Sequence, residues 1–329
     1  MKKILSYLCI LLLASLTIAS CNKSKIGKFS IDNFSNGKAG EVIVVVDNKY
    51  LTDETIHYLE DFLYQPQIAL NQEEPMFTML RFETKDFSSL FQRHRSIIQF
   101  DINPNFSSNT FIIENNVWAR PQVHIYCRGN NMDSLMFLFK QNENEILESL
   151  YNNDLKRVQY YAASNNDVYI ERKIKDKFGI NLTVPNTYNI AREEDNFMWL
   201  RFKTVKNDRF IIIYKTEGND LSRNGLIETR NEITKIFIPG AIEGAYPIVT
   251  EQMGFPIYND NVNVGTISGA ELRGLWESVG DKMGGPMYEF SFIDKTNENV
   301  ISVGGFVYAP EEDKRDYLRE VEAIVKSVR

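Results

Sequence analysis

The sequence predicts a mixed α+β fold in which amphipathic helices pack against two sheets. The run EVIVVVD at 41–47 is continuously apolar and bounded by charge, which is typical of a strand covered on both faces. From Met132 to Leu150 the apolar residues recur at the spacing of an amphipathic helix. Strand patterns then restart with FMWLRFKT at 197–204 and RFIIIYK at 209–215. The second set of strands indicates a second sheet.

Caps and turns place the elements of the first half. Thr52 can cap a helix that runs to Phe62, and Asn131 can cap the helix that begins at Met132. More helix is expected over 152–179, ending at Gly179. Shorter strands are predicted at FTMLRFE (77–83), SIIQFDI (96–102), TFIIEN (110–115) and QVHIYC (122–127), with a brief helix over 88–93.

The second half is expected to alternate between helices and strands. Helices are predicted over 226–237 and 271–279, and a hairpin joins strands at 286–294 and 300–308. Pro310 lies near the first turn of a last amphipathic helix. Both halves end in a strand, a tight turn and an acid-capped helix, which raises the hypothesis of two related halves. We place an N-terminal α/β domain over 41–185 and a C-terminal α/β domain over 186–329.

The first twenty residues have the layout of a secretory signal peptide. Lys2 and Lys3 precede an apolar run that is too short for a permanent membrane span. Its end, Ile18-Ala19-Ser20-Cys21, resembles the lipobox of bacterial lipoproteins. That resemblance implies cleavage after residue 20 and acylation of Cys21, with palmitate-type chains whose combined burial gives a stable anchor. Asn22 is not the aspartate that retains such proteins on the inner membrane, so the resemblance implies the outer membrane of a Gram-negative envelope.

Charge is distributed unevenly after this processing. The mature chain has 35 basic and 44 acidic side chains, a net charge of −9, yet residues 22–40 carry a net +3. We therefore expect a basic lipidated tether over 21–40 that faces anionic lipid, followed by an acidic body. Phosphate contacts need clustered Lys and Arg. The sequence contains no such cluster, which argues against a nucleic-acid partner.

The remaining reactive residue types give no recognisable centre. Cys127 would be the one cysteine left in the body, in a strand pattern typical of a buried hydrophobic residue. His57, His94 and His124 fall in different predicted elements, so no metal site is expected. Phosphate-loop and dinucleotide fingerprints are absent from the sequence, so no cofactor is expected.

The most unusual stretch is RGLWESVGDKMGGPMYEF at 273–290. If 271–279 is helical, Arg273, Trp276 and Glu277 share one face, and Gly284 and Gly285 let backbone approach a bound group. These five residues are the predicted binding groove, with the indole of Trp276 partly accessible. The alternative is that Trp276 packs in the core. A weaker site is Arg93-His94-Arg95, either an anion site at a strand start or a solvated charge run.

The segments RGLWE, MGGP, GGFVYAP at 304–310 and RHRSIIQFDI at 93–102 together resemble an uncharacterised family of Gram-negative envelope lipoproteins, a domain of unknown function. The resemblance implies a membrane-anchored protein and brings no catalytic residues. We expect a non-catalytic binding or assembly factor on the periplasmic side of the outer membrane, with a protein or envelope component as partner. An envelope hydrolase that uses two carboxylates is the alternative, because such pairs leave no sequence signature. A small-ligand carrier with an aromatic lining is the third hypothesis.

Overall fold

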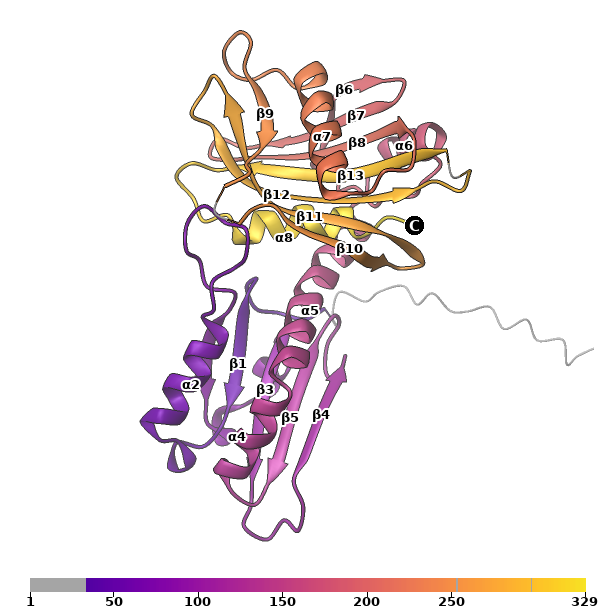
Figure 1. Ribbon diagram of the computed structural model, residues 1–329. Coiled ribbons are helices and arrows are strands. Elements are labelled where there is room, and N and C mark those ends of the chain that lie inside the picture. Colours follow the sequence, from indigo (N-terminus) through magenta and orange to yellow (C-terminus); the bar gives the residue numbers. More distant parts are fainter. Residues whose placement is uncertain (1–33, 253, 297) are drawn as a thin grey trace, which may run out of the picture. The chain divides into compact units, whose positions relative to one another are not determined.

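The apolar runs of the sequence form internal strands of two separate sheets, as the computed structural model shows (Figure 1). The structure describes residues 34–252, 254–296 and 298–329. The predicted mixed α+β fold with helices packed against two sheets is confirmed. The predicted signal peptide, Cys21 and most of the tether lie outside the described residues.

The first sheet has five strands and is mostly parallel. Its order is β2 (Thr78–Phe82), β1 (Glu41–Val45), β3 (Ser96–Ile102), β5 (Val123–Gly129) and β4 (Thr110–Asn115). Only β4 runs antiparallel to its neighbour. The EVIVVVD run forms β1 inside the sheet, with Val42 and Val44 buried on one face and Ile43 and Val45 on the other. Two-sided burial is what its unbroken apolar character predicts.

Helices cover one face of this sheet, as Figure 1 shows. Thr52 caps α2 by accepting from Thr55 N, and Asn131 caps α4 by accepting from Ser134 N, so both predicted caps are confirmed. The helices of the first half, including the short α3, are α2 (Asp53–Leu63), α3 (Ser89–Gln92), α4 (Met132–Gln141), α5 (Glu143–Ser164) and α6 (Val168–Phe178). Gly179 ends α6 in the left-handed conformation, as predicted.

The second sheet is antiparallel throughout its described pairings. Its order is β10 (Ile257–Val264), β11 (Ile267–Val279), β12 (Gly284–Ile293), β13 (Asn299–Tyr308), β8 (Asp208–Glu217), β7 (Phe197–Lys203) and β6 (Asn189–Glu194). A short strand, β9 (Tyr246–Val249), pairs with the last residues of β11. The FIIIY run lies in β8, between β13 and β7, so the prediction that it is internal is confirmed.

Each face of the second sheet has its own helical cover. Helix α7 (Arg223–Phe237) packs over Phe210, Ile212 and Phe306. Helices α6 and α8 (Arg315–Val325) pack over the alternate residues, such as Ile211 and Ile213. The period-two alternation of strand side chains therefore assigns every residue of this sheet to the α7 side or to the α8 side.

Three expectations from the sequence need correction. Residues 271–279 belong to strand β11 and not to a helix, because they pair with β12 and with β9. The last helix begins at Arg315, several residues after Pro310. The two halves share a pattern but not a topology, since one sheet is mostly parallel and the other antiparallel.

Residues 34–329 form one compact unit, and the buried ion pair between Asp154 and Arg319 joins its two halves. The carboxylate of Asp154 on α5 accepts from Arg95 Nη1 at 3.0 Å, from Arg319 Nη1 at 2.7 Å and from Gly40 N at 2.8 Å. Arg319 lies on α8, whereas Gly40 and Arg95 border the first sheet. No helix in the described ranges is both long enough and apolar enough to cross a membrane.

Candidate functional site

The predicted groove does not form, because its residues are on a strand. Successive side chains of a strand point to opposite faces, so Arg273 and Trp276 are separated by the sheet. Arg273 faces α8, where its guanidinium donates to Glu322 from Nη1 at 2.9 Å and from Nη2 at 2.6 Å. Glu277 is exposed. The structure therefore does not bring these three side chains together.

Trp276 is buried, so the prediction that its indole stays partly accessible is wrong. Its side of β11 faces α7, and the residue is only 4% exposed. The indole Nε1 donates to the carbonyl oxygen of Val307 on β13 at 3.0 Å. The neighbouring Pro286 on β12 has no backbone N–H, so the indole supplies the donor that the strand lacks there.

Gly284 and Gly285, the two residues before Pro286, leave room for Trp276 and Val307 to approach closely. A Cβ at Gly285 would lie 2.2 Å from Val307 O and 3.2 Å from Trp276 Nε1. The space that glycine leaves is therefore used by the protein itself. A Cβ at Gly284 would likewise meet the backbone of Trp276 at 2.9 Å.

The triplet Arg93-His94-Arg95 is neither an open anion site nor a solvated charge run, because its last two residues are buried. Arg95 is paired with Asp154. His94 Nδ1 donates to the Ser96 carbonyl oxygen at 3.0 Å, and burial lowers the pKa of its imidazole. Arg93 Nη2 donates to Phe34 O at 3.3 Å. The triplet holds the strand start in place.

A cavity of about 200 Å³ lies on the α7 side of the second sheet. Four aromatic residues from different strands provide much of its wall, and these are Trp199, Phe210, Trp276 and Phe306. Their rings form a continuous series. The ring centroids of Trp199 and Phe210 are 5.8 Å apart, those of the stacked Phe210 and Phe306 are 4.5 Å apart, and those of Phe306 and Trp276 are 5.1 Å apart. The rest of the wall is supplied by the polar residues Arg201, Asp208 and Ser278 and by Ile238, Pro239, Gly240, Ala241, Pro247 and Met283. Of the five predicted groove residues, Trp276 alone lines this cavity.

The polar part of the wall is unusual in its hydrogen bonding. Arg201 Nη2 donates to Asp208 Oδ2 at 2.6 Å, but four other polar atoms of the wall have no partner within the described part of the chain. The four atoms without a partner are Trp199 Nε1, Arg201 Nε, Asp208 Oδ1 and Ser278 Oγ. We refer to the residues that carry them as the cavity cluster.

This cluster is costly unless something pairs with it. Leaving a buried donor or acceptor unpaired costs about 1–3 kcal/mol. Of the eleven buried side-chain atoms without a partner in the described residues, four belong to this one cavity wall. Native structures pair most of their buried polar groups, so such a concentration calls for a functional explanation.

The cluster carries a sequence signal that the groove hypothesis missed. Each of three strands presents an aromatic and a polar residue two positions apart, which puts both on one face. The pairs are Trp199 with Arg201, Phe210 with Asp208, and Trp276 with Ser278. The pairs are visible in the sequence, whereas their convergence depends on the strand order.

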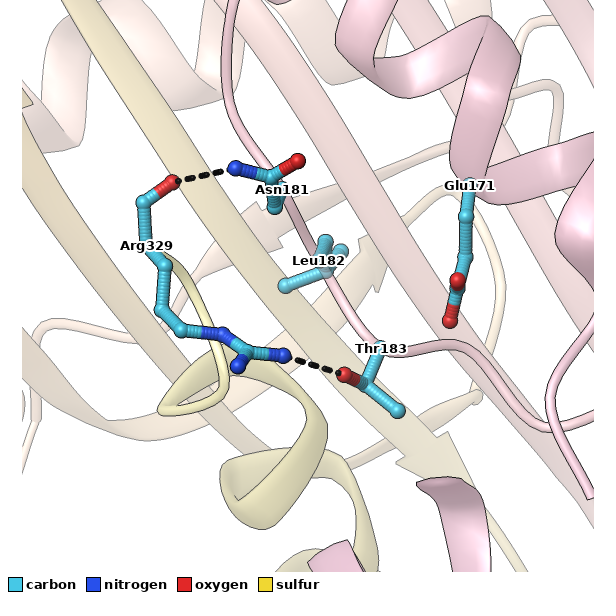
Figure 2. Close-up of a pocket in the computed structure, with 5 residues that line it drawn as sticks. All are labelled: Glu171, Asn181, Leu182, Thr183 and Arg329. Atoms are coloured by element: carbon cyan, nitrogen blue, oxygen red, sulfur yellow. Dashed lines mark hydrogen bonds between the residues drawn. The ribbon is translucent and has the colours of Figure 1, made fainter. Parts of the chain in front are cut away.

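A second hollow, shown in Figure 2, is polar but fully engaged in the fold. Its volume is about 290 Å³. Arg329 Nη2 donates to Thr183 Oγ1 at 3.3 Å, and Asn181 Nδ2 donates to the Arg329 carbonyl at 3.5 Å. Glu171 accepts from Val184 N at 3.2 Å and from Asn166 Nδ2 at 2.8 Å. These bonds fasten the segment after α6 to its surroundings.

No carboxyl group in the described residues has the clearly raised pKa that is expected of a general acid. The carboxyl groups whose pKa moves clearly are all shifted downward, and these are Glu83, Glu193, Asp220, Asp294, Glu312 and Glu322. A general acid at neutral pH needs the opposite shift. Cys127 is buried, and burial raises the pKa of its thiol to about 12, so it packs as a hydrophobic side chain. No group of His, Cys, Asp and Glu side chains in these ranges is placed to hold a metal ion.

Comparison with known families divides the chain into two matched segments. Residues 35–162 match a domain of unknown function (DUF8532), and residues 167–327 match a second domain of unknown function (DUF4837). No curated protein matches the chain. The matches are consistent with an uncharacterised family, and the cavity lies wholly within the DUF4837 segment.

Proposed function

We propose that this chain is a lipid-anchored, non-catalytic binding protein of the bacterial envelope, on the periplasmic side of the outer membrane. Its binding site is the cavity between the second sheet and the segment 238–241 that follows α7. The observation that carries the proposal is the cavity cluster, whose residues line one aromatic-lined space and carry four buried polar atoms without partners in the described residues. Concave, mostly apolar sites with a few convergent polar groups are the usual form of small-ligand sites.

The anchor part of the proposal rests on residues 1–21. The charged start, the apolar run and the cysteine after Ile18-Ala19-Ser20 are what a lipoprotein signal needs. Substituting Cys21→Ala is expected to move the protein from the membrane fraction to the soluble fraction, because acyl chains supply the hydrophobic attachment. Membrane retention of that variant in the absence of partners would contradict the anchor.

The hydrolase alternative receives no pair of residues from the described geometry. It asked for two carboxylates that converge in a cleft with a raised pKa. In the cavity, Asp208 is the single carboxylate, and it is paired with Arg201 at 2.6 Å. A binding role uses all of the groups that the cavity presents, so we favour it.

Binding can be tested through the three tryptophans of the chain. Trp199 and Trp276 line the cavity, whereas Trp118 packs beside His124 on the first sheet. The full chain, labelled with 5-fluorotryptophan and held in lipid nanodiscs, is titrated with benzyl alcohol. Saturable changes in the ¹⁹F signals of Trp199 and Trp276, with the Trp118 signal unmoved, are the expected result.

A blocked cavity provides the control. Ala241 lies on the exposed rim of the cavity, so Ala241→Phe is expected to abolish the changes while Ala241→Ser retains them. Equal responses from all three tryptophans, or a response that survives Ala241→Phe, would mean non-specific partition and would overturn the proposed site.

A further inference from the structure

Resting on the proposed function, we infer that the cavity binds a neutral, hydroxyl-bearing ring of the size of one hexopyranose unit. The inference concerns the chemical class of the ligand. It rests on the hydrogen-bonding types, the charge, the aromatic surface and the volume of the cavity.

The hydrogen-bonding types exclude simple ions. Trp199 Nε1 and Arg201 Nε are donors only, Asp208 Oδ1 is an acceptor only, and the Ser278 hydroxyl is both. A carboxylate or phosphate could satisfy the donors but not Asp208. An ammonium group could satisfy Asp208 but neither donor. Hydroxyl groups donate and accept, so one hydroxyl-bearing molecule satisfies the whole set.

The charge of the cavity points to the same class. The guanidinium of Arg201 and the carboxylate of Asp208 form an ion pair at 2.6 Å, so the polar wall is neutral as a unit. A charged ligand would give up its hydration without a free opposite charge to compensate. A neutral ligand does not meet that penalty.

The remaining wall fits the C–H faces of a saturated ring. The faces of aromatic rings carry partial negative charge and attract the weakly positive C–H edges of a ligand. Trp199, Phe210, Phe306 and Trp276 line one continuous surface beside the polar groups. A molecule with hydroxyls at its edge and C–H groups on its faces contacts both parts at once.

The volume limits the ligand to one ring. At about 200 Å³, the cavity is smaller than the ~300–1,000 Å³ that is typical of sites for drug-sized ligands. The four atoms without a partner in the described residues are also buried, so their side chains must turn toward the cavity for a ligand to reach them. Ser278, which is 8% exposed, needs a rotation about one torsion only.

The experiment uses the same fluorinated full chain in nanodiscs and four probes of similar size. Methyl α-D-glucopyranoside is the neutral hydroxyl-bearing ring. Glucuronate adds a negative charge, glucosamine adds a positive charge, and cyclohexanol keeps a saturated ring with one hydroxyl. We expect saturable shifts of Trp199 and Trp276 with the pyranoside, and binding at least about tenfold weaker for the other three. Glucuronate and glucosamine lose affinity because their added charge is desolvated, and cyclohexanol because it lacks most of the hydroxyls.

Two conservative variants tie the preference to the cluster. Trp199→Phe keeps an aromatic ring but removes the indole donor, and Ser278→Ala removes the hydroxyl. Each is expected to weaken pyranoside binding about tenfold, as for one hydrogen bond. In Trp199→Phe the Trp276 signal serves as the reporter.

The outcomes separate this inference from the proposed function. If benzyl alcohol binds in the cavity and the pyranoside does not, the ligand class is wrong while the binding site stands. Tighter binding of glucuronate, glucosamine or cyclohexanol than of the pyranoside would likewise overturn the class. If no probe moves the Trp199 and Trp276 signals, both the class and the proposed function fail.

Discussion

Two buried polar clusters lie on opposite faces of the second sheet, and they differ in how their side chains are paired. On the α8 side, Glu322 is fully buried and accepts from Arg273, Lys326 and Tyr151. We call these four residues the α8 cluster. On the α7 side, the cavity cluster contains four atoms without a partner in the described chain. The α8 cluster is complete and closed, whereas the cavity cluster is incomplete and borders an opening.

This difference separates a structural role from a binding role. A buried charge whose hydrogen bonds are all made inside the protein stabilises one arrangement of helix and sheet. A polar group without an internal partner gains most when a ligand supplies one. Removing a group should therefore destabilise the fold in the α8 cluster, whereas removing an unpaired atom of the cavity cluster should leave stability nearly unchanged.

The largest effect is expected from Glu322→Ala. The change leaves the guanidinium of Arg273 without its buried partner, which costs about 3–5 kcal/mol of unfolding free energy. Urea denaturation measures this cost. The control is Asp316→Ala on the same helix, where the carboxylate is exposed and the expected change is below about 1 kcal/mol. A similar small change for both variants would remove the distinction between the clusters.

Trp276→Ala should come next. The variant loses a buried indole and its bond to Val307, which costs about 3 kcal/mol, the lower end for a large core residue because a cavity already adjoins it. A thermal melt is expected to show a large fall in Tm. Trp276→Phe keeps the ring and is expected to cost about 1 kcal/mol for the lost hydrogen bond. A near-native melt for Trp276→Ala would show that the indole is not part of the core.

Acid should weaken the α8 cluster in a defined range. Burial alone would raise the pKa of Glu322, but the charges of Arg273 and Lys326 outweigh it and lower the pKa from 4.5 to about 2. Because the folded pKa is the lower one, this carboxylate contributes stability above pH 4.5 and loses that contribution as the pH falls toward 2. Unfolding free energies should fall by on the order of 2 kcal/mol more in the wild type than in Glu322→Ala between pH 6 and 3. Parallel pH profiles for the two proteins would refute this.

The smallest effect is expected from Ser278→Ala. Its hydroxyl has no partner among the residues that the structure describes, so its removal should be neutral or should stabilise the fold by up to about 1 kcal/mol. The matched change Ser291→Ala breaks a buried bond of 2.7 Å to Ser302 and should cost about 1–2 kcal/mol. Equal losses in denaturant midpoint would show that the Ser278 hydroxyl is paired after all.

The sequence predicts most elements of this fold because their signals are local. The apolar run of β1, the cap at Asn131 and the left-handed Gly179 each lie within a few residues of the element that they define. The prediction of a helix at 271–279 was wrong because Arg273, Trp276 and Glu277 have the spacing of one helical face although they lie on strand β11. Arg273 is tolerated on a buried strand face because Glu322, 49 positions away, neutralises it. That partner is invisible to a local pattern.

The cavity was out of reach for the same reason. Its aromatic and polar pairs lie on β7, β8 and β11, and the order β11, β12, β13, β8, β7 brings them to one face. Strand order follows from long-range pairing and not from the period of any one segment. The small-ligand hypothesis rested on the numbers of Tyr and Phe in the sequence, and only the fold shows which rings meet.

Asp154 has a consequence for how this chain can be inherited. Its carboxylate takes one hydrogen bond from Gly40, one from Arg95 and one from Arg319, so it binds the DUF8532 segment, to which it belongs, to the DUF4837 segment. A gene encoding the DUF4837 segment alone would leave Arg319 without this carboxylate, whereas Asp154 in the DUF8532 segment alone would keep its pair with Arg95. Recombination that exchanged the DUF8532 segment for an unrelated domain would meet the same penalty. A chain that carries the DUF4837 segment without the DUF8532 segment must therefore expose or replace this arginine.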